Sequence, residues 1–213
     1  SQLAYIAYRY EDADLQSITS GTSDSKNLSV TLLQDPVYLK RLDCSTTTLP
    51  EETKTVSIYS LGERDALVWG NNKYLILAPT IFLKKGTTSE NLSTELLNHR
   101  LTLYYLSAEG DEDANTLKLY LRYEISGIGE SSTEETDDKE SWASDYNVQY
   151  TNVSYVNLQP IISMYKSTHS GSEPEKVTVE YEYNNSASSI PTIAKKQTKT
   201  VTYSLYTETS SNN

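Results

Sequence analysis

The chain has 213 residues, and its 18 Lys and Arg residues against 29 Asp and Glu residues give a formal net charge of −11. Such a surface repels a phosphate backbone and an anionic membrane, which argues against nucleic-acid partners. The composition does not exclude catalysis or protein binding. No run of about 18 apolar residues occurs, and we therefore expect no membrane span. A chain of this length can bury a sizeable core without disulfides.

The residue usage is typical of β-proteins. Ser and Thr make up about a quarter of the chain, and Tyr outnumbers Phe 18 to 1. Thr and Tyr favour strands, where a half-exposed face suits an apolar body with a polar tip. This usage fits secreted, surface or virion proteins. It predicts an extracellular or cell-surface location, with a virion as the alternative. The first residue is Ser1, which fits removal of either a leader or an initiator Met.

The chain opens with an apolar segment followed by a polar one. Residues 1–10 read SQLAYIAYRY, a strand pattern with apolar side chains on both faces, and residues 11–26 are polar and loop-like. We therefore predict an N-terminal strand and polar arm over residues 1–26 and a single β-sandwich domain over residues 27–213.

The centre of the chain predicts a long hairpin. In residues 116–125, apolar and polar side chains alternate over ten positions, which places them on opposite faces of a strand. Residues 101–106 also alternate, and the short acidic connection contains a Gly. Residues 66–69 with 73–77, and 176–183 with 198–208, predict two more hairpins.

Turn signals every 8–15 residues separate about a dozen strand-like runs. Residues 28–34, 37–42, 54–60, 142–150, 152–158 and 161–166 complete the set, and residues 87–100 are the one candidate helix. We therefore predict an all-β fold. It is an antiparallel β-sandwich, Ig-like or jelly-roll-like, with about a dozen strands and at most one short helix.

An acidic turn offers a weak calcium site. Asp111, Asp113 and Asn115 have the spacing that starts a calcium-binding loop. The EF-hand is excluded because Thr116 and Arg122 occupy the positions of its Gly and Glu. A solvated acidic turn is the alternative. We predict no metal site and no cofactor.

Residues that could carry catalysis are sparse. His99 and His169 lie 70 positions apart, no G-x-S-x-G motif occurs, and both histidines are expected at the surface. Glu180 and Glu182 share a strand face that is expected to point toward water. Cys44 is the only cysteine and is expected to be buried or half-buried. The sequence predicts a protein that is not an enzyme.

The preferred hypothesis is a structural subunit of a self-assembling surface filament, pilus-like or fimbria-like, or a virion component. An N-terminal donor strand would pair with an open sheet edge of a neighbouring copy, so that the chain forms a homo-oligomer. The anchoring side chains would be Leu3, Tyr5, Ile6, Ala7 and Tyr8.

Two alternatives stay open. In the first, the N-terminal segment is an ordinary first strand of its own sheet. The chain could also be a β-sandwich module that binds carbohydrate or protein, in which Trp69 and Trp142 would line a sugar-binding face.

Overall fold

The computed structural model describes residues 3–20, 27–62, 67–107, 115–128, 141–184 and 190–205. The backbone contacts divide the chain into two units, Ser1–Leu39 and Lys40–Asn213. Each unit is described below by itself. Within the described residues, the protein contains 15 strands, arranged in sheets that mix parallel and antiparallel pairs, and three short α-helices.

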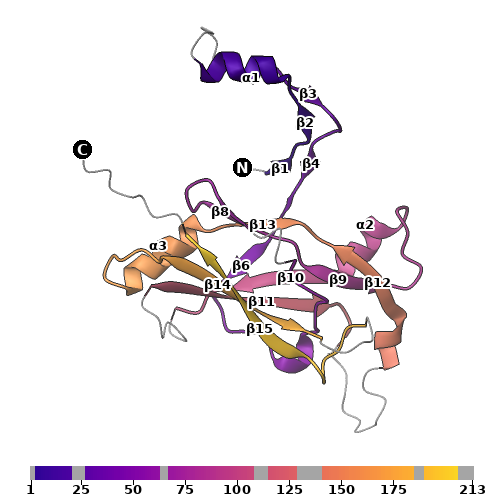
Figure 1. Cartoon of the computed structure of the whole chain (residues 1–213). Helices are drawn as coiled ribbons and strands as arrows, with labels where there is room; N and C mark the ends of the chain where they lie inside the picture. The colour runs from indigo at the N-terminus through magenta and orange to yellow at the C-terminus, as the bar shows by residue number, and fades with distance from the viewer. Residues whose placement is uncertain are drawn as a thin grey trace. The chain divides into compact units, whose positions relative to one another are not determined.

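The N-terminal unit is built from two short antiparallel ladders and a helix. Strand β1 (Ala4–Tyr5) pairs with β4 (Val37–Tyr38), and β2 (Tyr8–Arg9) pairs with β3 (Thr31–Leu32). Helix α1 (Asp12–Thr19) follows β2 (Figure 1). The expected loop over residues 11–26 is therefore partly helical. Asp12 and Asp14 lie in the first turn of α1, where negative charge interacts favourably with the helix dipole.

A five-stranded sheet dominates the larger unit. Its strand order is β15-β14-β11-β10-β6. Strands β10 and β11 are antiparallel, as are β14 and β15, whereas β11 runs parallel to β14 and β10 runs parallel to β6 (Figure 1). The bounds are β6 (Asp43–Ser45), β10 (His99–Tyr104), β11 (Thr116–Ile125), β14 (Lys176–Tyr183) and β15 (Gln197–Ser204).

The remaining strands form smaller sheets. A four-stranded sheet has the order β5-β13-β8-β7, and β12 pairs with β9. The bounds are β5 (Lys40–Arg41), β7 (Leu67–Trp69), β8 (Tyr74–Leu77), β9 (Thr80–Lys84), β12 (Tyr146–Thr151) and β13 (Ser154–Asn157). Three short 3-10 helices are η1 (Glu52–Lys54), η2 (Leu96–Asn98) and η3 (Ser141–Asp145).

These sheets confirm a mainly β fold and the three expected hairpins, including the central one, where Leu103 lies opposite Leu121. The expectation of purely antiparallel pairing is wrong. Parallel pairs join segments that are distant in sequence, so no local turn signal marks them. A two-layer sandwich stays a prediction.

The expectation of at most one helix is also wrong. Helix α2 (Leu92–Glu95) lies within the predicted helical region, but α1 and α3 (Gln159–Thr168) are additional. The run 161–166 reads as β-like, yet it lies inside α3. Ile161 and Tyr165 are one helical turn apart and both are buried. Pro160, which we expected to separate two strands, suits the first turn of a helix.

One apolar core runs through the larger unit. It combines side chains from the five-stranded sheet with side chains from β8, β9, β13 and α3. Residues 55–61 connect these parts. The Val56 amide donates to the Tyr123 carbonyl at 2.8 Å, and the Ile58 amide donates to the Glu182 carbonyl at 2.9 Å. Ser60 forms a bridge with Thr80 of β9. The expected strand over 54–60 is therefore an extended connection between sheets.

We expect Leu119→Ala to destabilise the protein by about 3 kcal/mol, because Leu119 is fully buried on β11 and its truncation leaves a cavity. The measurement is the free energy of unfolding in urea. Leu97→Ala is the matched control, because the side chain of Leu97 is 83% exposed. Equal losses for the two variants would contradict the placement of β11 in the core.

Candidate functional site

Exposed apolar side chains concentrate on the N-terminal unit. It carries nine of the fourteen large hydrophobic residues that are exposed in the described chain, although it has less than a fifth of the residues. They are Tyr5, Ile6, Tyr8, Tyr10, Val30, Leu32, Leu33, Val37 and Tyr38. Clustered apolar surface of this kind marks interaction sites in soluble proteins. We call these nine side chains the N-terminal apolar surface.

The predicted assembly residues lie in this unit. Tyr5, Ile6 and Tyr8 are exposed, whereas Leu3 and Ala7 are partly covered. Their backbone pairs with residues of the same unit. The Leu33 amide donates to the Ala7 carbonyl, and the Leu39 amide donates to the Leu3 carbonyl, both at 2.9 Å. The segment therefore forms strands in its own unit, and whether it also pairs with a neighbouring chain stays a prediction.

A small hollow lies in the larger unit between β5, β6, β9 and β10, with a volume of about 90 Å³. Its floor is apolar and includes Leu42, Ile81 and Leu101. Its rim is polar, with three cationic side chains (Lys40, Arg41 and Arg100), one carboxylate (Asp43) and the amide of Asn152. Pockets for drug-sized ligands measure roughly 300 Å³ or more. The hollow can therefore hold only a small molecule or a single side chain.

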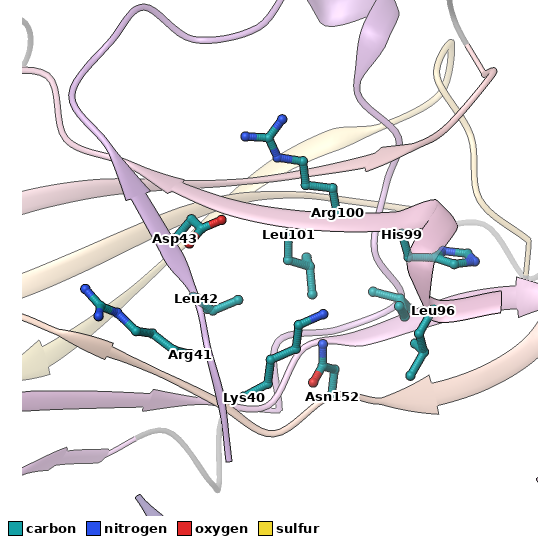
Figure 2. A pocket seen from close by; sticks show the side chains of 10 residues that line it. Lys40, Arg41, Leu42, Asp43, Leu96, His99, Arg100, Leu101 and Asn152 are labelled. Carbon is teal, nitrogen blue, oxygen red and sulfur yellow. The ribbon is translucent and has the colours of Figure 1, made fainter. Parts of the chain in front are cut away.

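Figure 2 shows how the polar side chains are arranged. Lys40 and Asn152 point toward the same space next to Leu101, and the side chains of Arg41 and Arg100 point away from it. The Ser154 hydroxyl donates to Oδ1 of Asn152 at 3.1 Å. This bond orients the amide so that its nitrogen faces Lys40 (Figure 2). The Asn152 amide is thus a positioned hydrogen-bond donor.

A chain of buried charges lies on the other face of the five-stranded sheet from the core. Arg122 Nη2 donates to Glu180 Oε1 at 2.9 Å, and Arg122 Nε lies 3.7 Å from Glu182 Oε1. Lys196 Nζ lies 3.1 Å from the same Glu182 oxygen. Lys196 also donates to the backbone carbonyls of Glu52 and Thr55. These contacts hold the connection that follows η1 onto the sheet.

The expectation that Glu180 and Glu182 point toward water is wrong for Glu182, which is 6% exposed, while Glu180 is half-buried. The segments around Thr55 and Lys196 cover this face. Burial lowers the pKa of Lys196, and the charge of Glu182 offsets part of that effect. Glu182 Oε2 has no hydrogen-bond partner within the described part of the chain. Glu182 therefore depends on its cationic neighbours.

His99 is buried, so its expected surface position is also wrong. Its Nε2 lies 3.0 Å from Glu95 Oε1, and its Nδ1 lies 2.6 Å from the Tyr123 hydroxyl. Because a carboxylate only accepts, Nε2 donates to Glu95, and the Tyr123 hydroxyl, which contacts Nδ1, also donates to the Phe82 carbonyl at 3.2 Å. Glu95 also accepts the Lys84 amide at 2.9 Å. The cluster therefore joins α2 to β9, β10 and β11.

Burial lowers the pKa of His99, although the hydrogen bond and charge of Glu95 offset part of the shift. Burial would raise the pKa of Glu95, but its hydrogen bonds to His99 and Lys84 outweigh this and hold the pKa below its ordinary value. Burial raises the pKa of Tyr123 well above its usual range. Direct hydrogen bonds thus join a buried histidine, a carboxylate and a buried tyrosine. His99 also lines the small hollow between β5, β6, β9 and β10.

The other predicted site residues lie apart from these clusters. Asp111 and Asp113 fall outside the described residues, and Asn115 accepts the Glu175 amide at 2.8 Å through its carbonyl. Among the residues that are described, no group of three or more His, Cys, Asp and Glu side chains is placed to hold a metal ion. His169 is half-buried and stacks on Tyr165.

Two further sequence expectations concern Cys44 and the tryptophans. Cys44 is exposed on the edge strand β6, so the expectation that it is buried or half-buried is wrong. Trp69 is 55% exposed and stacks on Tyr74, and Trp142 is partly buried against Tyr146. A carbohydrate-binding face stays a prediction.

We expect Lys196→Met to destabilise the protein by roughly 3 kcal/mol, because it leaves the buried Glu182 carboxylate with one cation fewer. Lys166→Met removes an exposed pair with Glu173 and should cost less than about 1 kcal/mol. Urea unfolding of both variants gives the comparison. Similar losses of unfolding free energy in the two variants would show that burial does not strengthen the Lys196–Glu182 ion pair.

We expect acid to destabilise the protein through His99. Its folded-state pKa is lowered, so the unfolded chain binds the proton more readily, and stability falls as pH drops below about 6.5, by at most about 1.4 kcal/mol per pH unit. The loss from Glu95 begins only below its unfolded pKa of about 4.3. The measurement is the free energy of unfolding between pH 5 and pH 7.5. His99→Gln should flatten this dependence and His169→Gln should keep it; the reverse pattern contradicts the assignment.

The comparisons with known proteins identify a fold. No protein-family model matches the chain, and no curated protein matches it. None of the described helices is long and apolar enough to cross a membrane.

Solved structures do match. A Bacteroides fragilis protein described as a "putative lipoprotein" aligns with a TM-score of 0.67 at 19% identity, over 96% of this chain and 82% of that chain. An uncharacterized Parabacteroides merdae protein aligns with a TM-score of 0.46 at 15% identity, over 97% of this chain and 82% of that chain. A NigD-like immunity protein from Bacteroides caccae aligns with a TM-score of 0.43 at 12% identity, over 90% of this chain and 71% of that chain. The chain thus shares the fold of the Bacteroides fragilis protein.

Proposed function

We propose that this chain is a non-enzymatic assembly module of the cell envelope, which joins a neighbouring protein, by preference a second copy of itself, through its N-terminal unit. The observation that carries the proposal is the N-terminal apolar surface. Nine large apolar side chains lie exposed on a unit whose ladders are two residues long. Two-stranded ladders are marginally stable alone, so a partner that covers this surface would stabilise the unit.

The proposed contact is strand addition. Both strands of a two-stranded ladder have an outer edge with free backbone donors and acceptors, and an extended segment of a neighbour can pair there. Backbone hydrogen bonds would give affinity, and alternating side chains such as Tyr5 and Tyr38 would fix the register. This differs from the donor strand expected from the sequence, because residues 3–9 already pair within the unit and would act as a template.

The envelope location rests on the fold shared with the Bacteroides fragilis protein described as a "putative lipoprotein". It agrees with the Ser-rich, Thr-rich and Tyr-rich usage of the sequence. The filament geometry is a finer proposal within the same idea. The assembly proposal does not depend on that geometry.

We expect Leu33→Ser combined with Tyr38→Ser to weaken self-association of the full chain by at least tenfold, because these side chains are 63% and 68% exposed and supply apolar contact area. Light scattering coupled to size-exclusion chromatography over a concentration series measures the effect. Leu97→Ser, which changes an 83% exposed side chain of the larger unit, is the matched control.

Three outcomes are informative. Association that the N-terminal variant loses and the control keeps supports the proposal. Equal loss in both variants moves the contact away from the N-terminal unit. A wild-type chain that stays monomeric throughout the series contradicts self-assembly and leaves a different protein as the partner.

A further inference from the structure

The hollow between β5, β6, β9 and β10 is lined by several cationic side chains, although the protein as a whole is acidic. The described chain places no carboxylate within ion-pair distance of Lys40, Arg41 or Arg100, and the same is true of other described cations such as Lys73 and Lys85. The net charge of the chain is −11. Three cations that form no ion pair with a described carboxylate line one hollow, and Asp43 is the only carboxylate among its described lining residues, so the region is locally positive.

Two donors converge inside the hollow. Figure 2 shows the Lys40 amino group and the Asn152 amide nitrogen directed into the same space. The position of Lys40 is fixed because β5 pairs with β13, where Lys40 lies opposite Ser154. Ser154 in turn donates to Oδ1 of Asn152 at 3.1 Å. Ser154 therefore helps to position both the Lys40 amino group and the Asn152 amide nitrogen. An ammonium and an amide N–H at one point suit an anionic oxygen acceptor.

The floor of the hollow restricts the kind of anion. Leu42 is 3% exposed, Ile81 is 1% exposed and Leu101 is 9% exposed, and Leu96 contributes a further apolar side chain. Inorganic phosphate has no hydrocarbon to place against this floor, whereas a short aliphatic carboxylate has both an anionic head and an apolar tail. His99 also lines the hollow, but its two ring nitrogens bind Glu95 and Tyr123.

We propose that this hollow is a binding site for a small aliphatic carboxylate, with Lys40 and Asn152 holding the carboxylate and Leu42, Ile81 and Leu101 packing against the tail. Arg41 and Arg100, which point away in Figure 2, add positive potential at the rim. The carboxylate can belong to a free short-chain acid or to an acidic side chain of another protein. The volume of about 90 Å³ limits the ligand to a few carbon atoms.

Titration of the full chain tests the site. Sodium butyrate is added at constant ionic strength, with sodium chloride and sodium phosphate as comparison salts, and amide shifts are followed by NMR. We expect saturable shifts at Lys40, Leu101 and Asn152 with butyrate and weaker binding of phosphate. A parallel titration with N-acetylglutamate amide separates the two sources, because only a site open to a partner's side chain also accepts this probe.

Two variants and one control make the result specific. Lys40→Gln removes the charge and should weaken butyrate binding about tenfold or more. Asn152→Asp keeps the acceptor for Ser154 but replaces the donor with a carboxylate, and should abolish binding. Lys85→Gln removes the same charge from an exposed position outside the hollow and should leave binding unchanged. Thermal unfolding of each variant confirms that it is folded.

The following results would overturn the proposal. One is the absence of saturable shifts with butyrate beyond those caused by chloride. Another is butyrate binding by Lys40→Gln that is as tight as binding by the wild type. Phosphate binding as tight as butyrate binding would overturn the aliphatic part of the assignment. None of these results bears on self-association, because the lining residues all belong to the larger unit.

Discussion

Burial of both faces of β11 is the constraint on which the larger unit depends. One face carries Leu117, Leu119 and Leu121 into the core, and on the other face Tyr120 and Arg122 are also buried. A charged side chain on a covered face needs a partner, because an isolated buried charge costs several kcal/mol. The parallel pairing of β11 with β14 supplies one by placing Glu180 within 2.9 Å of Arg122. Glu182 and Lys196 extend the chain of charges to the connection that follows η1. Ion pairs therefore stabilise the polar face of β11, and apolar packing stabilises its opposite face.

The position of the hollow follows from the way in which short neighbouring segments pair. Strand β5 is only two residues long, and its parallel pairing with β13 sends Leu42 into the core and leaves Lys40 above the apolar floor. The turn between β12 and β13 sets Asn152 beside it, held by its own bond to Ser154. The uncommitted donors thus arise where two sheets meet and neither ladder continues. Such junctions, and not the interiors of regular sheets, are where backbone geometry leaves side chains free to bind a ligand.

Local patterns predicted the parts of the fold that depend on neighbours in the sequence. The three hairpins follow from alternation and a turn, so residues 116–125 were assigned correctly. The parallel pairs of β11 with β14 and of β10 with β6 join distant segments, and no local pattern encodes them. Residues 161–166 were misassigned because adjacent apolar residues at 161 and 162 suit a buried strand, while the spacing of Ile161 and Tyr165 fits a helix equally well. The burial of His99 and Glu182 depends on segments that cover them from elsewhere. Among candidate sites, the apolar N-terminal residues were visible in the sequence, and the pairing of Lys40 with Asn152 was not.

The two units differ in what holds them together, and this difference supports a role for the N-terminal unit in association. The larger unit has a continuous core of side chains below a tenth exposed. The N-terminal unit has ladders of two residues, and most of its large apolar side chains are on the surface. Fully burying one such side chain contributes about 1.5–3 kcal/mol, so a partner that covers a few of them can match the cost of ordering short ladders. Under the proposed function, ordering and association are coupled, because the N-terminal unit gains stability when a neighbour covers its apolar surface. In this proposal, the hollow lies in the larger unit and the association surface lies in the N-terminal unit of the same chain.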